Sequence, residues 1–260
     1  MITHNDIIAD MHTHTVFSKH AFSTLQENIE AACKMGMRYM VSCDHYFNDG
    51  TEIEKKNEIN RILYIAQRAN PNPQNVYVIN SVECNLEQPM RQSLKERLNS
   101  GYIKYRPVGL HSWFLPREER SLHEILMDFC EEQKKYNYNV FVHIERELDR
   151  IAHGRYGKTM HPELMPFFEE IVDYAKRNHV WLEVNEASLT QDNCGNRERM
   201  LAWLSLAREN DNPIVLGSDA HFSAEVGRFS NTVDILNSID YPKELIMNCN
   251  KEQIETMLSL

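Results

Sequence analysis

The chain opens with an apolar run that ends in two histidines, Ile7-Ile-Ala-Asp-Met-His-Thr-His14. Side chains of a β-strand alternate between its two faces, so His12 and His14 point to the same side of an extended backbone. Two imidazoles on one side can bind a metal ion, but the pair alone is weak evidence in a chain with 12 histidines. Its meaning therefore depends on the segments that follow.

The residues after this pair have the pattern of a helix and a second strand. A sequence that resembles a capping box, Ser23-Thr-Leu-Gln26, starts a helical spacing of apolar residues that Gly36 ends. Residues 37–43 then predict a strand that leads directly into Asp44-His45. Strand, helix and strand in this order form a βαβ unit, in which the two strands are parallel.

The same alternation continues to the end of the sequence. Helices are predicted over 52–69, 121–136, 164–178, around 201–207, and over 232–239 and 251–258; strands are predicted over 76–79, 103–110, 140–142, 180–184 and 214–218. The segment 145–161 is rich in charge and has little apolar period, so we expect a loop or lid there. About seven strand–helix units predict one α/β domain over residues 1–260, a closed barrel similar to the (β/α)₈ fold. A doubly wound open sheet is the alternative, but its Gly-x-Gly-x-x-Gly fingerprint is absent from the sequence.

The composition narrows the class of protein. Hydrophobic residues make up 42% and charged residues 25% of the 260 residues, which is typical of a soluble globular domain. The formal net charge of -10 disfavours nucleic-acid binding, which depends on Lys and Arg neutralising phosphates. The six cysteines form no Cys-x-x-Cys pair, and the sequence has no signal peptide or membrane-spanning run, so we expect reduced thiols and a cytoplasmic protein without membrane partners.

Metal-ligating residues recur at the carboxyl ends of the predicted strands. They are His12, His14, His45, Glu83, His111, His143, Asp219 and His221. In a parallel barrel these strand ends meet at one rim. Imidazole and carboxylate together suit Zn²⁺, Mn²⁺ or Fe²⁺ better than Ca²⁺ or Mg²⁺. Since one tetrahedral ion takes about four ligands, this set predicts a hydrolytic centre with two or three ions and a bridging carboxylate.

These residues resemble the motifs of the PHP (polymerase and histidinol phosphatase) superfamily of metal-dependent phosphoesterases. The motifs follow in order as Asp10-Met-His-Thr-His-Thr15, Ser42-Cys-Asp-His45, Glu83, Gly109-Leu-His111, Val142-His143 and Gly217-Ser-Asp-Ala-His221. The segment 14–25, which contains His20, is similar to that of small single-domain bacterial phosphatases with a trinuclear site. The resemblance covers nearly the whole chain.

The resemblance implies a distorted TIM-like (β/α)₇ barrel, often assembled as a homo-oligomer, with three divalent metal ions. It implies one ion held by His12, His14, Glu83 and Asp219, a second shared through Glu83 with His111 and His143, and a third bound by His20, His45 and His221. We expect His12, His14, Glu83, Asp219 and His221 to take part in catalysis.

The expected reaction is hydrolysis of a phosphate ester of a small metabolite by a metal-activated hydroxide. Histidinol phosphate is one candidate substrate. A PHP-type nuclease or phosphodiesterase is the alternative within the enzyme class, and the acidic net charge disfavours it. In a different class, the chain would be a metal-binding regulatory protein without catalytic activity.

Other polar residues allow two interpretations each. Asp10 and Asp44 precede ligands and are expected either to orient imidazoles or to make local hydrogen bonds. The basic run in 145–161 predicts a solvated loop, or one cation that contacts the substrate phosphate; it consists of Arg146, Arg150, His153, Arg155 and Lys158. Four histidines outside the strand ends are expected to be ordinary surface or packing residues: His4, His123, His161 and His179. Many PHP phosphatases have His-Pro-Gly where this chain has His143-Ile144-Glu145. Of all the properties that the resemblance implies, the identity of the substrate is therefore the least transferable to this chain.

Overall fold

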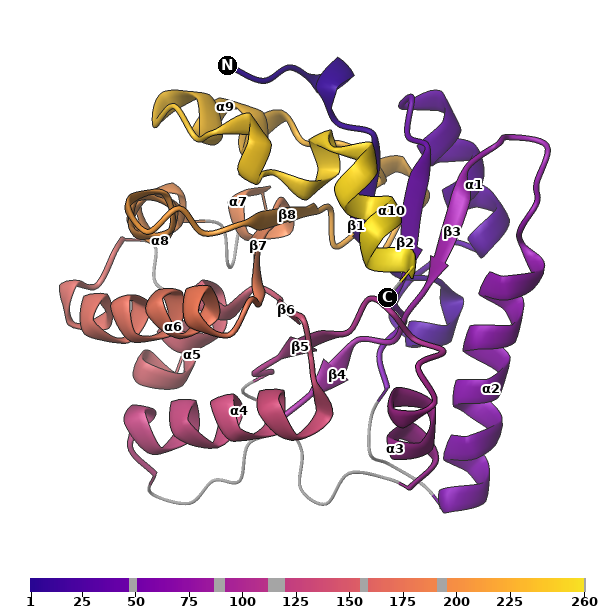
Figure 1. Cartoon of the computed structure of the whole chain (residues 1–260), viewed down its shortest axis with the longest axis horizontal. Helices are drawn as coiled ribbons and strands as arrows, with labels where there is room; N and C mark the ends of the chain where they lie inside the picture. Colours follow the sequence, from indigo (N-terminus) through magenta and orange to yellow (C-terminus); the bar gives the residue numbers. More distant parts are fainter. Residues whose placement is uncertain (47–50, 87–91, 112–119, 155–158, 191–195, 260) are drawn as a thin grey trace.

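The structure is a computed structural model that describes residues 1–46, 51–86, 92–111, 120–154, 159–190 and 196–259. Strands and helices alternate along these residues, and the helices surround the strands (Figure 1). The strands are β1 (Ala9–Thr13), β2 (Tyr39–Ser42), β3 (Tyr77–Asn80), β4 (Cys84–Asn85), β5 (Pro107–Gly109), β6 (Val140–Phe141), β7 (Trp181–Asn185) and β8 (Ile214–Gly217). The α-helices are α1 (Leu25–Lys34), α2 (Glu52–Arg68), α3 (Gln92–Asn99), α4 (Leu122–Tyr136), α5 (Ile144–His153), α6 (Met165–Arg177), α7 (Ala187–Thr190), α8 (Arg197–Glu209), α9 (Ser230–Ser238) and α10 (Lys251–Ser259).

All described strand pairs are parallel, which confirms the predicted α/β class. The strands form one sheet of order β1-β2-β3 and a second of order β4-β5-β6-β7-β8. Isolated parallel bridges connect Thr13 with Ala220 and His45 with Glu83. A continuous closed barrel stays a prediction, because the described strands are paired in two separate sheets.

The boundary between the sheets lies in a three-residue break between β3 and β4. There the backbone N–H of Ser81 donates to Ser42 O at 3.1 Å, and that of Glu83 donates to Asp44 O at 3.2 Å. The chain thus follows β2 past its end before it pairs with β5 as β4. Glu83 stands at the point where the chain leaves one sheet for the other.

Both faces of the strands are buried, as expected for parallel sheets covered by helices. Alternate residues such as Met11, Val41 and Val215 pack together in a small inner cluster. Their neighbours along the strands pack outward in a larger cluster with the helices, where the Phe168 and Trp203 rings meet edge to face at 5.4 Å. The strands therefore have fixed positions, and so do the residues at their ends.

The start of α1 lies one residue later than the sequence predicts. Thr24 is the N-cap, and the Glu27 carboxylate accepts both its backbone N–H and its hydroxyl hydrogen. The predicted cap, Ser23, instead accepts a hydrogen bond from the backbone N–H of Ser223. A carboxylate three residues after Thr24 accepts more strongly than the Gln26 amide, which explains the shift.

The predicted loop over 145–161 is wrong for its first half, because α5 begins at Ile144. The charged residues of this helix face inward: Glu145, Arg146, Glu147 and Asp149 are all buried. Ile144, Leu148 and Ile151 recur at helical spacing, so an apolar period is present and the high charge of the segment masked it. Residues 155–158 of this segment lie outside the described residues. The sequence also did not predict α3 and α7, and β5 occupies only part of the predicted strand 103–110.

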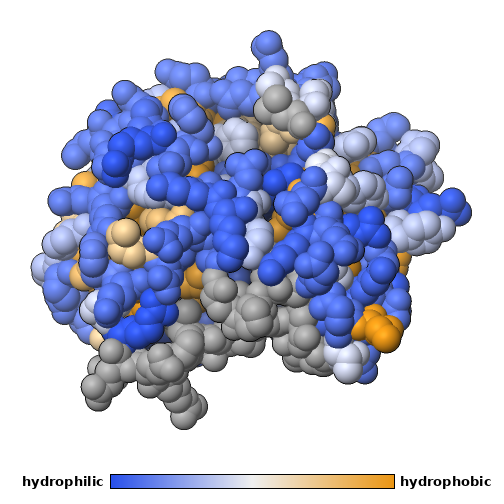
Figure 2. Space-filling view, turned by 60° about the horizontal axis from the view of Figure 1, so that its bottom comes forward, coloured by the Kyte–Doolittle hydropathy of each residue, from blue (hydrophilic) through white to orange (hydrophobic). Residues whose placement is uncertain are grey.

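Within the described ranges, every helix is too short or too polar to span a lipid bilayer. Figure 2 shows one face of the molecule that is mostly hydrophilic, with hydrophobic residues scattered over it. Scattered apolar residues are normal on a protein surface and do not by themselves mark a binding site.

Candidate metal centre

The predicted ligands come together at the carboxyl ends of the strands. His12 lies in β1, and the others follow strand ends: His14 after β1, His45 after β2, Glu83 in the break before β4, His111 after β5, His143 after β6, and Asp219 and His221 after β8. His20 lies between β1 and α1 and is exposed. Backbone hydrogen bonds from Asp219 N to His12 O and from His14 N to Ala220 O, both 2.9 Å, hold the first and last of these segments side by side.

Glu83 is the centre of the group. Its Oε1 lies 2.8 Å from His143 Nε2 and 3.2 Å from His111 Nε2. Its Oε2 lies 2.7 Å from His45 Nδ1 and 3.5 Å from Nε2 of both His12 and His14. Burial alone would raise the pKa of this carboxyl, but the surrounding imidazoles lower it well below its ordinary value. One fully buried carboxylate therefore contacts five histidines.

Asp219 supplies the second carboxylate of the centre. Its Oδ1 lies 3.1 Å from His14 Nε2 and 3.5 Å from His12 Nε2. Its Oδ2 accepts a hydrogen bond from Asn185 Nδ2 at 3.3 Å and lies 3.5 Å from Arg146 Nη1. Burial opposes ionisation, but His12 and the His14 hydrogen bond lower the pKa of Asp219 well below its ordinary value.

A stack of imidazoles forms the outer part of the centre. The His14 ring lies 4.4 Å from both the His45 and the His221 rings, and the His20 ring lies 4.6 Å from the His221 ring. Desolvation of the ring and the neighbouring His45 and His221 lower the pKa of His20 to about 4. Burial and the neighbouring rings also lower the pKa of His14 well below its ordinary value, and the neutral imidazole is the form that binds metal.

The hydrogen bonds of His12 and His14 fit a cation between their rings. Ser18 Oγ donates to Asp44 Oδ1 at 2.6 Å, so it accepts from His14 Nδ1 at 3.1 Å. His12 Nδ1 donates to Glu183 Oε1 at 2.6 Å. The two Nε2 atoms then face each other at 2.9 Å, a distance that needs a proton or a cation between their lone pairs.

The local field favours positive charge at this position. Burial alone would lower the pKa of His12, but the carboxylate of Glu183 raises it well above its ordinary value. Four overlapping triads in the centre bring their ligand atoms within 4.8 Å of one another: His12/His14/Asp219, His12/Glu83/His143, His45/Glu83/His111 and His14/His45/His221. The residues present therefore fit more than one divalent metal ion.

Glu183 is the residue of this centre that the sequence analysis missed. It lies in β7, is buried, and bonds to His12 Nδ1 and, through Oε2, to the backbone N–H of His143 at 2.9 Å. Such carboxylate partners fix the orientation of metal-ligating imidazoles. An acidic residue inside the apolar strand Trp181-Leu-Glu-Val-Asn185 is the signal that could have identified it.

Asp10 and Asp44 make local hydrogen bonds. The Asp10 carboxylate accepts from three backbone N–H groups, those of His12, Ser218 and Gly227. Asp44 accepts from the backbone and hydroxyl of Thr15 and from Ser18. Asp44 therefore acts on His14 indirectly, through the hydroxyl of Ser18.

The backbone at three of the candidate ligands is in the left-handed region. The φ angles of His111, His143 and Asp219 are 25°, 38° and 56°. Non-glycine residues with such φ cost about 1–3 kcal/mol each and cluster at functional sites.

Two glycines leave room for these ligands. A Cβ at Gly217 would lie 2.1 Å from Glu183 Oε1 and 2.5 Å from His12 Cβ, and one at Gly109 would lie 2.8 Å from the rings of His111 and His143.

The basic run of the predicted loop is divided by the structure. Arg146 is buried beside Asp219, so the prediction of a solvated loop is wrong at this residue. His153 lies at the far end of α5, while Arg155 and Lys158 lie outside the described residues. Of the four histidines assigned no role, His123 is exposed and lies 3.3 Å from Glu170, and His4 and His179 are also on the surface.

Comparisons with known proteins show which proteins this chain is similar to. Residues 201–252 match the PHP_C family, described as PHP-associated. A probable phosphatase of Clostridium acetobutylicum is 26% identical over 260 residues, covering 95% of this chain and 92% of that protein.

Two solved structures are similar to this chain in fold. The histidinol phosphate phosphatase of Lactococcus lactis, complexed with zinc, L-histidinol and phosphate, has a TM-score of 0.58 at 15% identity, covering 91% of this chain and 93% of that one. A putative histidinol phosphatase of Listeria monocytogenes has a TM-score of 0.61 at 16% identity, covering 86% and 99%.

Proposed function

Because residues 201–252 match the PHP_C family and the sequence carries the PHP motifs along its length, we propose that the chain is a metal-dependent phosphatase of the PHP superfamily that acts on a small phosphorylated metabolite. The observation that carries this proposal is the buried Glu83 carboxylate, which lies within 3.5 Å of ring nitrogens from five histidines. A core that buries so many titratable groups is costly unless they hold cations. Relatives named probable phosphatases supply the reaction class.

We propose three divalent ions of Zn, Mn or Fe. The first would be held by His12, His14, Glu83 and Asp219, the second by Glu83, His111 and His143, and the third by His20, His45 and His221. When bound, such ions generate hydroxide near neutral pH and neutralise the charge of a phosphoryl group. Among the triads of nearby ligand atoms, His12/His14/Asp219 supports the first of these sets; the other three share residues between sets, which fits ions that lie close together.

The chain's own residues orient the ligands and the substrate. Glu183 holds the His12 ring, and Ser18 holds the His14 ring with Nε2 directed into the centre. Arg146, 3.5 Å from Asp219, is placed to donate a charge-assisted hydrogen bond to a phosphoryl oxygen.

The organic part of the substrate would enter a cavity beside Asp219. This cavity has a volume of about 300 Å³ and is lined by Glu186, Ser218, Asp219, Arg228 and Asn231 among others. The residues that line it are mostly charged or polar, but most of the surface they expose to it is apolar, which suits the carbon skeleton of a small alcohol with a few polar groups. Histidinol phosphate is a candidate, since one similar structure contains L-histidinol and phosphate.

The test is hydrolysis by protein loaded separately with Zn²⁺, Mn²⁺ and Fe²⁺. We expect turnover of p-nitrophenyl phosphate and of at least one small phosphomonoester in a panel that includes histidinol phosphate. His12→Ala and Asp219→Ala should abolish it, and His179→Ala, a surface change, should not. Unchanged turnover in both site variants would overturn the proposal.

Bound metal without hydrolysis across the panel would instead favour a regulatory metal-binding protein. Three further expectations stay predictions. The family resemblance predicts a distorted (β/α)₇ barrel, as one domain over residues 1–260, and a homo-oligomer. The sequence predicts a cytoplasmic location.

A further inference from the structure

A second group of metal-ligating side chains lies outside this centre, at the carboxyl end of α5. It consists of Asp149 and His153 on the helix and of His161 and Glu163 around the short 3₁₀ helix Pro162–Leu164. Ligand atoms of Asp149, His153 and His161 lie within 4.8 Å of one another. The His153 and His161 rings are stacked with centroids 3.9 Å apart.

The hydrogen bonds of His153 direct one ring nitrogen toward Glu163. Its Nδ1 lies 3.0 Å from Asp149 Oδ1 and 3.1 Å from the Asp149 backbone oxygen, both acceptors, so Nδ1 carries the proton. Nε2 of the neutral ring is then a lone pair, 3.1 Å from Glu163 Oε1. His161 Nδ1 lies 3.7 Å from the same carboxylate oxygen.

One carboxylate oxygen is thus flanked by two ring nitrogens. Two lone-pair atoms at this spacing need a proton or a cation between them.

Asp149 has the surroundings of a residue that orients a ligand. It is buried, and its Oδ2 lies 2.8 Å from Nη1 of the buried Arg199. Fixed by Arg199, it can hold the His153 ring in one tautomer and one orientation. A carboxylate that holds the distal nitrogen of a metal-binding histidine is a recurrent feature of zinc sites.

We propose that His153 Nε2, His161 Nδ1 and the Glu163 carboxylate form a separate site for one zinc-type divalent ion, oriented by Asp149. Two imidazoles and a carboxylate are a ligand set that Zn²⁺ accepts, with a water in the fourth position. The site is partly exposed: the His153 and His161 side chains are 22% and 33% accessible. An ion can therefore enter from solvent.

An ion at this site would fasten the end of α5 to the segment that precedes α6. The same helix starts at His143 and carries Arg146, both in the metal centre. The ion would therefore act on the position of α5 rather than on the reacting groups.

The experiment compares metal content and thermal unfolding in the full chain. Zn²⁺ per chain is measured after gel filtration for the wild type, His161→Ala, Glu163→Gln and His123→Ala. His123 is a matched control, because it is a surface histidine whose Nδ1 lies 3.3 Å from a glutamate, Glu170. His161→Ala and Glu163→Gln should each lose about one equivalent, and His123→Ala none.

Thermal unfolding and turnover separate this site from the metal centre. Added Zn²⁺ should raise the melting temperature of the wild type more than that of His161→Ala, while both keep hydrolysis of p-nitrophenyl phosphate. Equal Zn²⁺ content and equal Zn²⁺-induced shifts in the wild type and both variants would overturn the proposal. That result would leave a protonated His153 paired with Glu163. Loss of turnover in His12→Ala tests the phosphatase separately.

Discussion

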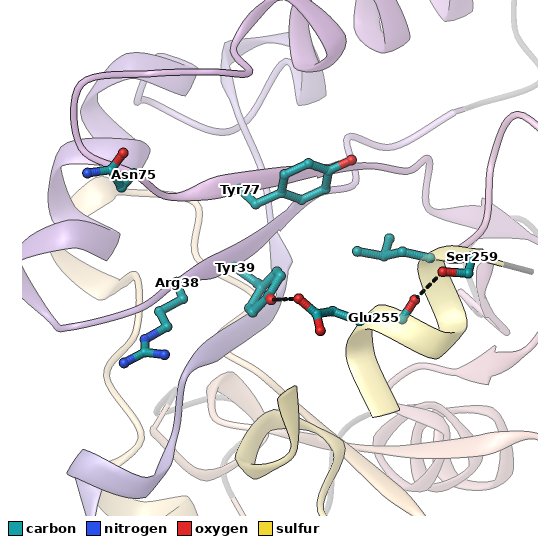
Figure 3. Close-up of a pocket in the computed structure, with 7 residues that line it drawn as sticks. Arg38, Tyr39, Asn75, Tyr77, Glu255 and Ser259 are labelled. Atoms are coloured by element: carbon teal, nitrogen blue, oxygen red, sulfur yellow. Dashed lines mark hydrogen bonds between the residues drawn. The ribbon is translucent and has the colours of Figure 1, made fainter. Parts of the chain in front are cut away.

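The carboxyl and amino ends of the parallel strands differ in the residues that they carry. At the carboxyl ends, eight other candidate ligands gather with Glu83. At the amino ends, Tyr39 and Tyr77 begin β2 and β3 and line a surface hollow of about 760 Å³ with Arg38, Asn75 and Glu255 (Figure 3). There Tyr39 Oη donates to Glu255 Oε1 at 3.1 Å, and the two tyrosine rings lie edge to face at 6.3 Å.

The difference shows how one scaffold separates stability from chemistry. The carboxyl ends bury charge and hold three residues at positive φ, both of which cost free energy. The amino ends have ordinary polar contacts with solvent nearby. In barrel-like α/β proteins, residues at the carboxyl ends serve catalysis and those at the amino ends serve stability.

The largest effect should come from the central carboxylate. Glu83→Gln keeps the shape but removes the charge beside five imidazoles, so turnover of an aryl phosphate should fall on the order of 10³-fold. Glu255→Gln makes the same change at the amino ends and should leave kcat within about twofold. Similar losses of turnover in both variants would contradict a catalytic role confined to the carboxyl ends.

Arginine substitutions should give the next largest difference. Removing a charge-assisted hydrogen bond costs about 1.5–3 kcal/mol, so Arg146→Ala should lower kcat/KM by about 10–100-fold. Arg38→Ala, at the amino ends, should leave it unchanged. If steady-state kinetics show Arg146→Ala to be as active as the wild type, Arg146 does not contact the substrate.

A glycine substitution tests how tightly the carboxyl ends are packed. A methyl group at Gly217 would lie 2.1 Å from Glu183 Oε1, so Gly217→Ala must displace Glu183 or His12. We expect a loss of about 1–3 kcal/mol in the free energy of unfolding, measured by urea denaturation, together with weaker metal binding. Wild-type stability and metal content in this variant would mean that β8 can move away from β1.

The smallest effect should come from the tyrosine at the amino ends. Tyr39→Phe loses one hydrogen bond to an exposed glutamate, which contributes about 0.5–1 kcal/mol, and activity should not change. Desolvation and the Glu255 carboxylate raise the pKa of Tyr39 in the folded protein. The neutral phenol therefore contributes to the free energy of unfolding below about pH 10, and this contribution is lost as pH rises through the folded-state pKa. Urea midpoints above pH 10 should therefore fall less steeply in Tyr39→Phe than in the wild type.

Much of the fold and of the candidate site follows from the order of residues along the chain. The predicted helices match the observed ones to within a few residues, since each of them buries one face, whereas α3, α5 and α7 were not predicted. The ligands could be placed at one end because parallel strands bring their carboxyl ends together. That logic needs only local patterns, such as His12-Thr-His14 or Asp219-Ala-His221.

Other features depend on contacts that no local pattern records. Glu183 is 171 residues from His12, and nothing beside it in the sequence indicates that partnership. The helix α5 has an apolar period, but no local pattern indicates that Arg146 and Asp149 are buried against the charged partners Asp219 and Arg199. The division into two sheets rests on backbone hydrogen bonds at 81–83, which any side chain can make.

The hydrogen bonds between His12, His14 and the segment 219–220 also bear on the order of events during translation. The ribosome releases the first two ligands more than 200 residues before Asp219 and His221. Until β8 emerges, His12 and His14 lack the carboxylate and the neighbouring strand that position them. A nascent chain therefore cannot complete the proposed first ion site before most of the domain has been made, so metal loading at the proposed centre would belong to the last stage of its biogenesis.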